Sequence, residues 1–304
     1  MDKKDIKELK ISIHIPFYVK KNKIKKFKIL QRVCKSYLKL SKKTNIFVHT
    51  NIKTRITNKR IKFLFYKLNN VHPYRLTWFP RKLMKKQIND FDIFIYSEDD
   101  VLFSKKNLDY WLKYKDICIK NNFNLGFLRI EKKKDLYAID QIKKFSYIKK
   151  IINTNFIVIE NPYSAMWIYD KNEFKKFVKS NYYEFKWNIK KIGNVNLDRE
   201  MSAIGWHGQD IKKGFNMGRY HASIIPFKKN KLDHSSFINH LSNNYSKNPA
   251  GLFGTFKIKN LVEKKLIKFK KPSKIKILGY KTIFNLYSLF RINIKDLKKK
   301  LNAR

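Results

Sequence analysis

Short apolar runs with strand-like composition alternate with longer stretches of helical periodicity through roughly the first hundred residues. The strand-like runs cover residues 11–15, 45–49, 61–66 and 92–96, and the helical pattern covers residues 23–39 and 76–88. Pro80 must lie in the first turn of the second helix or kink it. Strands that alternate with helices form βα units. The strands of such units pair in parallel, and the helices cover both faces of the resulting sheet. The sequence therefore predicts an α/β fold with a mixed, mainly parallel sheet and flanking helices.

The second half of the chain has a more mixed pattern. Ser104 precedes a helix expected over residues 105–120, and strand-like runs follow at residues 125–130, 136–139 and 156–159. Asp170 and Glu173 have the spacing of a capping box at the start of a further short helix. From about Leu261 onward the chain is dense in lysine and poor in acids. We expect one main domain over residues 8–254 and a basic C-terminal segment over residues 255–304.

The net charge is strongly positive, with 70 Lys and Arg residues against 23 Asp and Glu residues, for a formal charge of +47. Such a charge attracts polyanions, which include nucleic acid, anionic lipid and phosphorylated substrates. The abundance of lysine, isoleucine and asparagine is also what AT-rich codons would supply. The sequence contains no RRM, zinc or helix-turn-helix signature, so a nucleic-acid-binding protein is the alternative and not the first prediction.

The compartment is indicated by the cysteines and by the apolar segments. Cys34 and Cys118 are the two cysteines, which is typical of a reducing compartment, and no apolar run is long enough for a spanning helix. We expect a cytoplasmic protein that is soluble or peripheral at the inner face of a membrane. Residues 256–301 mix lysines with apolar residues, as a basic amphipathic helix at an anionic membrane does, although an ordinary docking helix has the same pattern.

Three consecutive acids, Glu98, Asp99 and Asp100, come directly after the apolar strand predicted over residues 92–96. Ligands of open α/β sheets bind beyond the carboxyl ends of the strands, so these carboxylates are expected to face the binding site. Like charges this close repel one another, and a divalent cation is their natural counter-charge. Carboxylate oxygens favour Mg²⁺ or Mn²⁺, whose remaining ligands are commonly waters and substrate phosphates. The alternative is a solvated turn that caps the next helix.

This acidic turn resembles the DxD-like motif of the GT-A glycosyltransferases, as its EDD variant, and His72–Met84 (HPYRLTWFPRKLM) resembles the helix before that motif in glycosyltransferase-like proteins. The resemblance implies a GT-A-like, Rossmann-like domain, a nucleotide-sugar donor and a Mn²⁺ or Mg²⁺ cofactor. It implies that Asp100 ligates the metal, and that Glu98 or Asp99 contacts the nucleotide or a metal-bound water.

A second carboxylate is expected in the segment NVNLDREMSAIGWHG. In a helix, Glu200 falls at the border of the apolar stripe formed by Leu197, Met201 and Ile204, where a pocket wall would lie. Glu200 is the first candidate for the general base that deprotonates the acceptor hydroxyl, and Asp198 is the second. The alternative is a surface acid that pairs with a neighbouring basic residue.

Four histidines lie in the stretch after this helix: His207, His221, His234 and His240. A histidine here could be a further metal ligand or could stabilise the leaving diphosphate, and the alternative is a hydrogen-bonded loop or core residue. The HL-x-N-x-Y pattern that begins at His240 resembles an ending found in the same glycosyltransferase-like proteins. His240 is therefore the preferred metal ligand, together with Asp100 and Asp99.

Two loops are candidates for substrate contacts. The segment NPYSAMW carries Tyr163 and Trp167, whose aromatic faces could pack on a sugar, although core packing explains Trp167 equally well. Thr50, Asn51 and Arg55 follow an early strand end, where a base or ribose could bind, and a solvated loop is the alternative.

Together these features predict a metal-dependent glycosyltransferase of the hexosyltransferase type that uses a nucleoside diphosphate sugar and a saccharide or lipid-linked acceptor. A metal-dependent nuclease or phosphotransferase that uses the same acids is a further alternative. Such an enzyme would normally recruit additional carboxylates or histidines around two metals.

Overall fold

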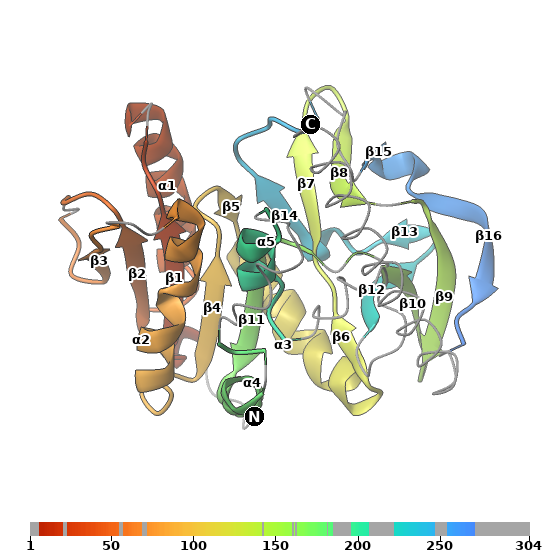
Figure 1. The fold of residues 1–304 in the computed structure, drawn as a ribbon. Helices are drawn as coiled ribbons and strands as arrows, with labels where there is room; N and C mark the ends of the chain where they lie inside the picture. Colours follow the sequence, from red (N-terminus) through yellow and green to blue (C-terminus); the bar gives the residue numbers. More distant parts are fainter. Residues whose placement is uncertain are drawn as a thin grey trace, which may run out of the picture.

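The structure of the chain is a computed structural model, which describes residues 6–20, 23–54, 57–68, 72–141, 143–159, 161, 163–180, 182–184, 196–206, 222–246 and 254–270. The fold is mixed α/β, which confirms the predicted class. Figure 1 shows a sheet with its helices on the left and further sheets, built from later strands, on the right.

The first sheet is largely parallel and carries the strands predicted for the first hundred residues. Its strand order is β11-β4-β1-β2-β3, and only β11 runs antiparallel, to β4. All seven residues of β1 are buried, as expected for a central strand covered on both faces. The bounds are β1 (Ile11–Phe17), β2 (Thr44–Thr50), β3 (Ile61–Phe65), β4 (Ile93–Ser97) and β11 (Met166–Asp170).

Helix α1 (Lys23–Leu38) and the pair η2 (Pro73–Trp78) and α2 (Pro80–Lys86) accompany this sheet. Leu30, Val33 and Tyr37 of α1 are fully buried, while most of its lysines face solvent. The single helix expected over residues 76–88 is divided at Phe79, because Pro80 is the first residue of α2. A proline is tolerated there, since the first helical N–H groups have no partner within the helix.

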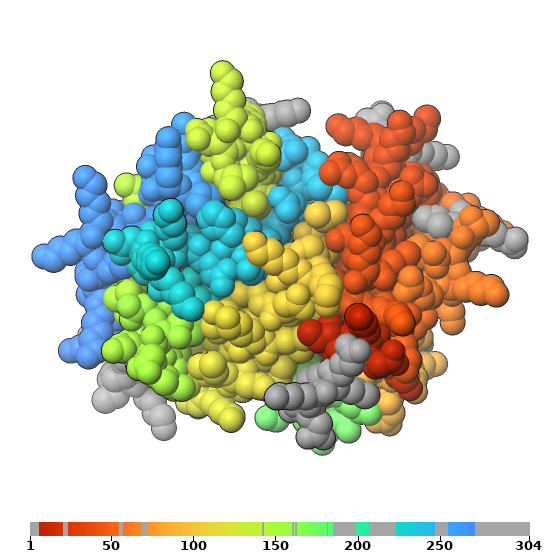
Figure 2. Space-filling model, turned by 180° about the vertical axis from the view of Figure 1, so that it is seen from behind, coloured from red at the N-terminus to blue at the C-terminus, as the bar shows by residue number. Residues whose placement is uncertain are grey.

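Helix α3 (Lys105–Lys120) connects the first sheet to the later strands. Ser104 and Asn107 form a capping box at its start. The Asn107 side chain also donates hydrogen bonds to the carbonyl oxygens of Ser235 and Phe237, at 2.7 and 2.8 Å. Seen from behind, α3 (yellow in Figure 2) lies between the N-terminal part of the chain and the late strands.

Within the described residues, the later strands form two more sheets. One has the order β13-β12-β10-β9-β16, with β6 beside β12, and the other has the order β15-β8-β7-β14-β5. Apolar side chains from both sheets form a second core cluster, which includes Leu128, Ile157 and Leu261. The bounds are β5 (Val101–Leu102), β6 (Phe123–Leu125), β7 (Leu128–Lys132), β8 (Leu136–Gln141), β9 (Phe145–Ile151), β10 (Thr154–Ile159), β12 (Ala222–Lys228), β13 (Lys231–Leu232), β14 (Phe237–His240), β15 (Gly254–Lys257) and β16 (Val262–Lys268).

Two further helices pack near the first sheet. Helix α4 (Lys171–Lys179) begins as predicted, with the Asp170 carboxylate accepting a hydrogen bond from the backbone N–H of Glu173 at 2.9 Å. Helix α5 (Asn196–Ile204) is the helix expected to carry the general base. The 3₁₀ turns are η1 (Ile6–Glu8), η5 (His234–Ser236) and η6 (Ile258–Asn260).

The first part of the expected C-terminal segment is built into the sheets. Strand β15 pairs with β8, and β16 pairs with β9. Residues 271–304, with most of the expected amphipathic stretch, lie outside the described residues. No helix in the described part of the chain combines the length and the apolar character needed to cross a membrane.

Candidate active site at an acidic turn

The three consecutive acids form a turn between β4 and β5 at the carboxyl end of β4. The backbone N–H of Glu98 donates to the carbonyl oxygen of Ala165 at 3.0 Å, which continues the pairing of β4 with β11. On the other side of the turn, β5 pairs with β14. The acidic turn therefore connects the first sheet to the sheet that contains β14, and it is held by hydrogen bonds on both sides.

Asp100 is held by residues from β14 and from the loop after it. His240 Nε2 lies 3.1 Å from Asp100 Oδ2, the Ser242 hydroxyl donates to the same oxygen, and the backbone N–H of Leu241 donates to the Asp100 carbonyl oxygen at 2.8 Å. Burial alone would raise the pKa of Asp100, but the hydrogen bonds from His240 and Ser242 hold it below its usual range. The second carboxylate oxygen, Oδ1, is buried and has no hydrogen-bond partner in the described part of the chain.

His240 lies between two carboxylates, because its Nδ1 is 2.6 Å from Glu131 Oε1. Burial lowers the pKa of His240, but the interactions with Asp100 and Glu131 outweigh this effect and raise it to about 9. Glu131 also accepts hydrogen bonds from the backbone N–H groups of Tyr245 and Ser246, and its pKa falls to about 2 in spite of its burial. Glu131 thus fixes the orientation of the imidazole ring, as an outer carboxylate does for a metal-binding histidine.

Glu98 points toward a second charged group, which is centred on Arg129. The Tyr163 hydroxyl donates to Glu98 Oε1 at 2.8 Å, and Arg129 Nη1 lies 4.0 Å from Glu98 Oε2. Burial raises the pKa of Glu98, and the positive charges of Arg129 and Arg199 oppose that effect. Arg129 itself is almost fully buried, with its Nε 2.7 Å from the Asp140 carboxylate.

Asp99 is paired with a lysine from α1. Lys26 Nζ lies 3.5 Å from Asp99 Oδ2 and also donates to the carbonyl oxygen of Tyr18 at 2.9 Å. Burial and the neighbouring Asp100 charge raise the pKa of Asp99 to about 7, although Lys26 opposes the shift. Lys26 therefore ties the segment after β1 to the acidic turn.

Helix α5 brings Glu200 and Arg199 to the same region. The two side chains form an ion pair with an Nη2 to Oε1 distance of 2.9 Å. Burial lowers the pKa of Arg199, but the charges of Glu98 and Glu200 raise it above its usual range. The guanidinium group of Arg199 thus links the acidic turn to α5 electrostatically.

Ser202 fixes the position of α5 against the strands. Its carbonyl oxygen accepts hydrogen bonds from Trp167 Nε1 at 3.0 Å and from Arg81 Nη2 at 3.1 Å. Its hydroxyl is 2.9 Å from the Tyr96 hydroxyl. At the end of the helix, Gly205 has a φ of +67°, and a Cβ atom there would lie 2.8 Å from the Trp167 ring. Both features require α5 to lie directly on β4 and β11.

Several buried polar atoms around the acidic turn have no hydrogen-bond partner among the described residues. They are Asp100 Oδ1, Arg199 Nε, Glu200 Oε2 and Asn243 Oδ1. Buried polar atoms are nearly always paired, so a group of unpaired ones marks a place where water, an ion or a ligand belongs. Three of these atoms are oxygen acceptors, one each from the acidic turn, from α5 and from the loop after β14, and the fourth is a guanidinium N–H donor.

The donor set fits a divalent cation that is shared with a ligand. The described residues contain no group of three or more His, Cys, Asp or Glu side chains that could hold a metal ion. Mg²⁺, however, is usually bound by one or two carboxylates together with waters and substrate phosphates. Asp100, with its unpaired Oδ1, is the residue that best meets that requirement.

Left-handed backbone conformations also gather at this site. Of the seven non-glycine residues with positive φ in the described part of the chain, Asp140, Ala165 and Asn243 lie here, with φ values of 60°, 57° and 48°. Asp and Asn adopt this conformation several-fold more often than other residues, so Ala165 is the unusual one. Each adjoins the interactions described above, because Asp140 pairs with Arg129, Ala165 accepts from Glu98 and Asn243 follows Ser242. Local backbone strain of this kind is often found at functional sites.

The remaining predicted ligand contacts lie in more structural positions. Trp167 is buried in β11, where its ring stacks on Tyr96 and Tyr169, so core packing accounts for it. Thr50 is fully buried at the end of β2, and the Asn51 side chain bonds both to the N–H and to the carbonyl oxygen of Val19. The Trp167 indole N–H donates to the carbonyl oxygen of Ser202, and Asn51 binds Val19, so these side chains hold the local structure together.

Other predicted residues lie apart from the site or outside the described residues. His234 lies in η5 and stacks on Phe237, away from His240 at the other end of β14. Arg55, His207, His221 and the side chain of Asp198 are outside the described residues.

Sequence reasoning missed Arg129, Glu131 and Asp140. A signal for two of them exists in the run LGFLRIEK, where Arg129 and Glu131 alternate with the apolar residues Leu128 and Ile130. Charged side chains are almost never fully buried unless they are paired, so charges in a core strand indicate a buried polar cluster.

Comparisons with known proteins add little to this description of the site. Neither a family model nor a curated protein sequence matches the chain. Among solved structures, a crystal structure of a glycosyltransferase involved in the glycosylation of the major capsid of PBCV-1 matches with a TM-score of 0.22 and 15% sequence identity. The match covers 40% of this chain and 50% of that one, so it spans only half of the other protein. At this TM-score the likeness carries no argument about fold or activity.

Proposed function

We propose that the chain is a metal-dependent glycosyltransferase that moves a sugar from a nucleoside diphosphate donor to a saccharide or lipid-linked acceptor. The observation that carries the proposal is the acidic turn at the carboxyl end of β4. There Asp100 is oriented by His240 and Ser242 and keeps a buried, unpaired carboxylate oxygen. The carboxyl ends of parallel strands are where α/β sheets bind their ligands.

The acidic residues have separate roles in this proposal. Asp100 would hold Mn²⁺ or Mg²⁺, with Asp99 or His240 as a second protein ligand and with waters and donor phosphates as the remaining ligands. Glu98 or Asp99 would contact the nucleotide. The bound cation would serve as a Lewis acid toward the leaving diphosphate. A protonated His240, whose pKa is raised to about 9, can instead offset diphosphate charge directly. Lys26, Arg129 and Arg199 supply further positive charge around the turn.

Glu200 is the proposed general base for the acceptor hydroxyl. Its Oε1 is held by Arg199, which fixes the carboxylate, and its buried Oε2 has no partner in the described part of the chain. A carboxylate that is held through one oxygen and has no hydrogen bond at the other can accept a proton there from a hydroxyl group within hydrogen-bond reach. Asp198, on the same helix, is the second candidate.

The test is calorimetric titration with a panel of nucleoside diphosphates, with and without Mn²⁺. Asp100→Asn keeps the shape of the side chain but weakens it as a metal ligand, so Mn²⁺-dependent nucleotide binding should fall at least about 10-fold. Asp109→Asn is the matched control, since Asp109 is an exposed acid on α3 that pairs with Lys105. Equal nucleotide affinity in both variants, with unchanged circular dichroism spectra, would exclude the acidic turn as the donor site.

A further inference from the structure

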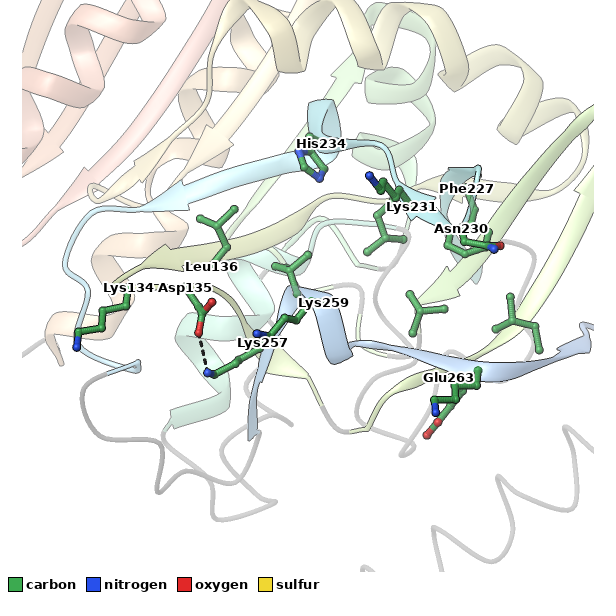
Figure 3. A pocket seen from close by; sticks show the side chains of 15 residues that line it. Lys134, Asp135, Leu136, Phe227, Asn230, Lys231, His234, Lys257, Lys259 and Glu263 are labelled. Atoms are coloured by element: carbon green, nitrogen blue, oxygen red, sulfur yellow. Dashed lines mark ion pairs between the residues drawn. The ribbon is translucent and has the colours of Figure 1, made fainter.

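A separate groove opens among the later strands, on residues that the acidic turn does not use. It has a volume of about 760 Å³ and is lined from three segments. These are the connection between β7 and β8 at residues 134–136, the β12–β13 hairpin at residues 227–232, and residues 257–266 in β15, η6 and β16. Figure 3 shows these segments around the groove, together with His234 of η5 on its upper side.

The rim of the groove carries more lysines than acids. Lys134, Lys231, Lys259 and Lys264 are all exposed, and none of the four forms an ion pair in the described part of the chain, although Lys257 and, to a smaller extent, Lys259 lower the pKa of Asp135. The acids at the groove are already engaged, because Asp135 pairs with Lys257 at 2.6 Å and Glu263 lies 4.0 Å from Lys144. Several cations around one concave surface focus a positive potential there and attract an anion.

The floor of the groove is aliphatic. Leu136, Ile258, Val262 and Leu266 line it, and all four are half-buried against the second core cluster. Covering such side chains with hydrocarbon is favourable, at about 25 cal/mol for each Å² of apolar surface removed from water. A ligand that satisfies both floor and rim must therefore carry an apolar part and a negatively charged part.

We propose that this groove binds the phosphate-bearing headgroup of an anionic lipid. The lysines would pair with the phosphate, and the aliphatic floor would contact the adjoining hydrocarbon. Nucleic acid fits the lining less well, because single strands bind by stacking bases on exposed aromatic rings and on arginine. The described lining residues include no arginine, the ring of Phe227 is buried, and the exposed imidazole of His234 already stacks on Phe237. A free phosphate compound would leave the aliphatic floor uncovered.

This proposal is independent of the reaction at the acidic turn, but the two sites lie close enough to cooperate. Six residues lead from His234, at the groove, through β14 to His240, and a chain of that length spans at most about 20 Å. Attachment of the groove to a lipid surface would therefore hold the acidic turn near acceptors carried on that surface.

The experiment measures binding of the full chain to phosphatidylcholine vesicles with and without phosphatidylglycerol. The variant Lys231→Gln/Lys259→Gln/Lys264→Gln removes three rim charges. The control Lys28→Gln/Lys35→Gln/Lys39→Gln removes three exposed charges on and beside α1, which lies at the opposite end of the molecule from β16 in Figure 1. Each lysine near an anionic surface strengthens binding about five-fold, so the rim variant should bind about 100-fold more weakly than the control.

Two additional arms identify the ligand. Val262→Thr keeps the side-chain shape and adds a hydroxyl to the floor, so it should weaken vesicle binding several-fold while binding of soluble tripolyphosphate stays unchanged. Competition with a single-stranded oligonucleotide tests the alternative partner.

The proposal is overturned if the rim and control variants bind anionic vesicles equally, or if vesicles of phosphatidylcholine alone bind as well as anionic ones. It is also overturned if Val262→Thr has no effect on vesicle binding. Loss of oligonucleotide binding in the rim variant with vesicle binding intact would assign the groove to nucleic acid instead.

Discussion

Arg129 is the residue on which the charge balance around Glu98 depends. Its side chain is 2% exposed, pairs with Asp140, and lies with its guanidinium carbon 5.1 and 5.3 Å from the ring centres of Tyr163 and Tyr245. A buried guanidinium with no anionic partner would be strongly unfavourable. The same charge opposes the rise in the pKa of Glu98 that burial causes. Arg129 therefore positions Glu98 and helps to keep it ionised.

Glu200→Gln tests the proposed base. Glutamine keeps the size of the side chain and an oxygen that can accept the hydrogen bond from Arg199, but it cannot take up a proton. Donor binding should persist while turnover falls about 100-fold or more, as measured by steady-state kinetics once a donor is identified.

Asp198→Asn is the comparison for this prediction. If Asp198→Asn loses turnover and Glu200→Gln keeps it, the base is Asp198. If both variants retain normal turnover, α5 carries no catalytic carboxylate and the proposed mechanism is falsified.

At the residue scale, the acids of the turn and His240 were predictable, and their partners were not. Three acids after an apolar strand form a local pattern that needs no knowledge of the fold. Arg129 and Glu131 reach the turn only because β7 pairs with β14 and β14 pairs with β5. Such long-range pairings have no signature in the sequence near the acids, so the charge network could not be assembled from the sequence alone.

At the element scale, periodicity predicted the parts of the first sheet with the clearest alternation of strand and helix. Strands β1, β2 and β4 and helix α1 lie within a few residues of their expected bounds. Strand β9 was missed because Lys149 and Lys150 interrupt its apolar pattern. Strand β11 was missed because it directly follows a segment containing Pro162, which indicated a loop. In the structure β9 is stabilised by pairing with β10, and β11 is stabilised by pairing with β4.

A buried histidine pair joins β1 to β2. His14 Nδ1 is 2.9 Å from His49 Nε2, and His14 Nε2 is 3.0 Å from Gln87 Oε1. His49 Nδ1 lies 2.9 Å from the Tyr66 hydroxyl. Burial lowers the pKa of His14 to about 3, although the Gln87 hydrogen bond opposes the shift, and burial and His14 lower the pKa of His49. The strands therefore pair through neutral imidazole rings.

This pair predicts that the free energy of unfolding falls in mild acid. Between about pH 6.5 and pH 3, the unfolded chain binds a proton at His14 that the folded chain does not bind. The contribution of His14 to the free energy of unfolding is therefore fully present above about pH 6.5. It decreases toward pH 3 by up to about 1.4 kcal/mol per pH unit. Urea unfolding at pH 7, 6 and 5 measures this slope.

The comparison variant for the acid effect is His14→Gln. It should be less stable at pH 7, because the stacking of His14 on Phe47 is lost, but its stability should change less between pH 7 and pH 5. Groups that do not interact with His14 are common to both proteins and cancel in the difference. His49 is the exception: burial lowers its pKa in both proteins, but the variant lacks the further lowering by His14, which reduces the slope of the variant in the same direction. Identical slopes for the two proteins would show that His14 does not titrate between the folded and unfolded states.

At the scale of the whole molecule, strands β10 and β12 contribute alternate side chains to two apolar clusters. One cluster joins residues of the first sheet, such as Ile13 and Ile95, to Phe156 of β10, and the other includes Ile157 and Leu261. Helix α3 and the pairing of β5 with β14 connect them. The candidate site is therefore positioned by both parts of the fold, and displacement of either part should disturb it.

The last prediction concerns residues 257–270, which complete the second cluster. Leu261, between η6 and β16, is fully buried there, and Val262 and Leu266 of β16 pack against the same cluster. Two shortened chains, one that ends at Phe256 and one that ends at Lys270, both lack residues 271–304, so their difference reports on residues 257–270 alone. Loss of a single large apolar core side chain costs about 2–5 kcal/mol, so the shorter chain should melt at least about 5 °C lower by calorimetry. Leu261→Ala in the full chain should lower the free energy of unfolding by about 2–5 kcal/mol. Equal melting temperatures for the two shortened chains would place η6 and β16 outside the cooperative core, and the rim lysines Lys259 and Lys264 would then lack the rigid support that the lipid groove requires.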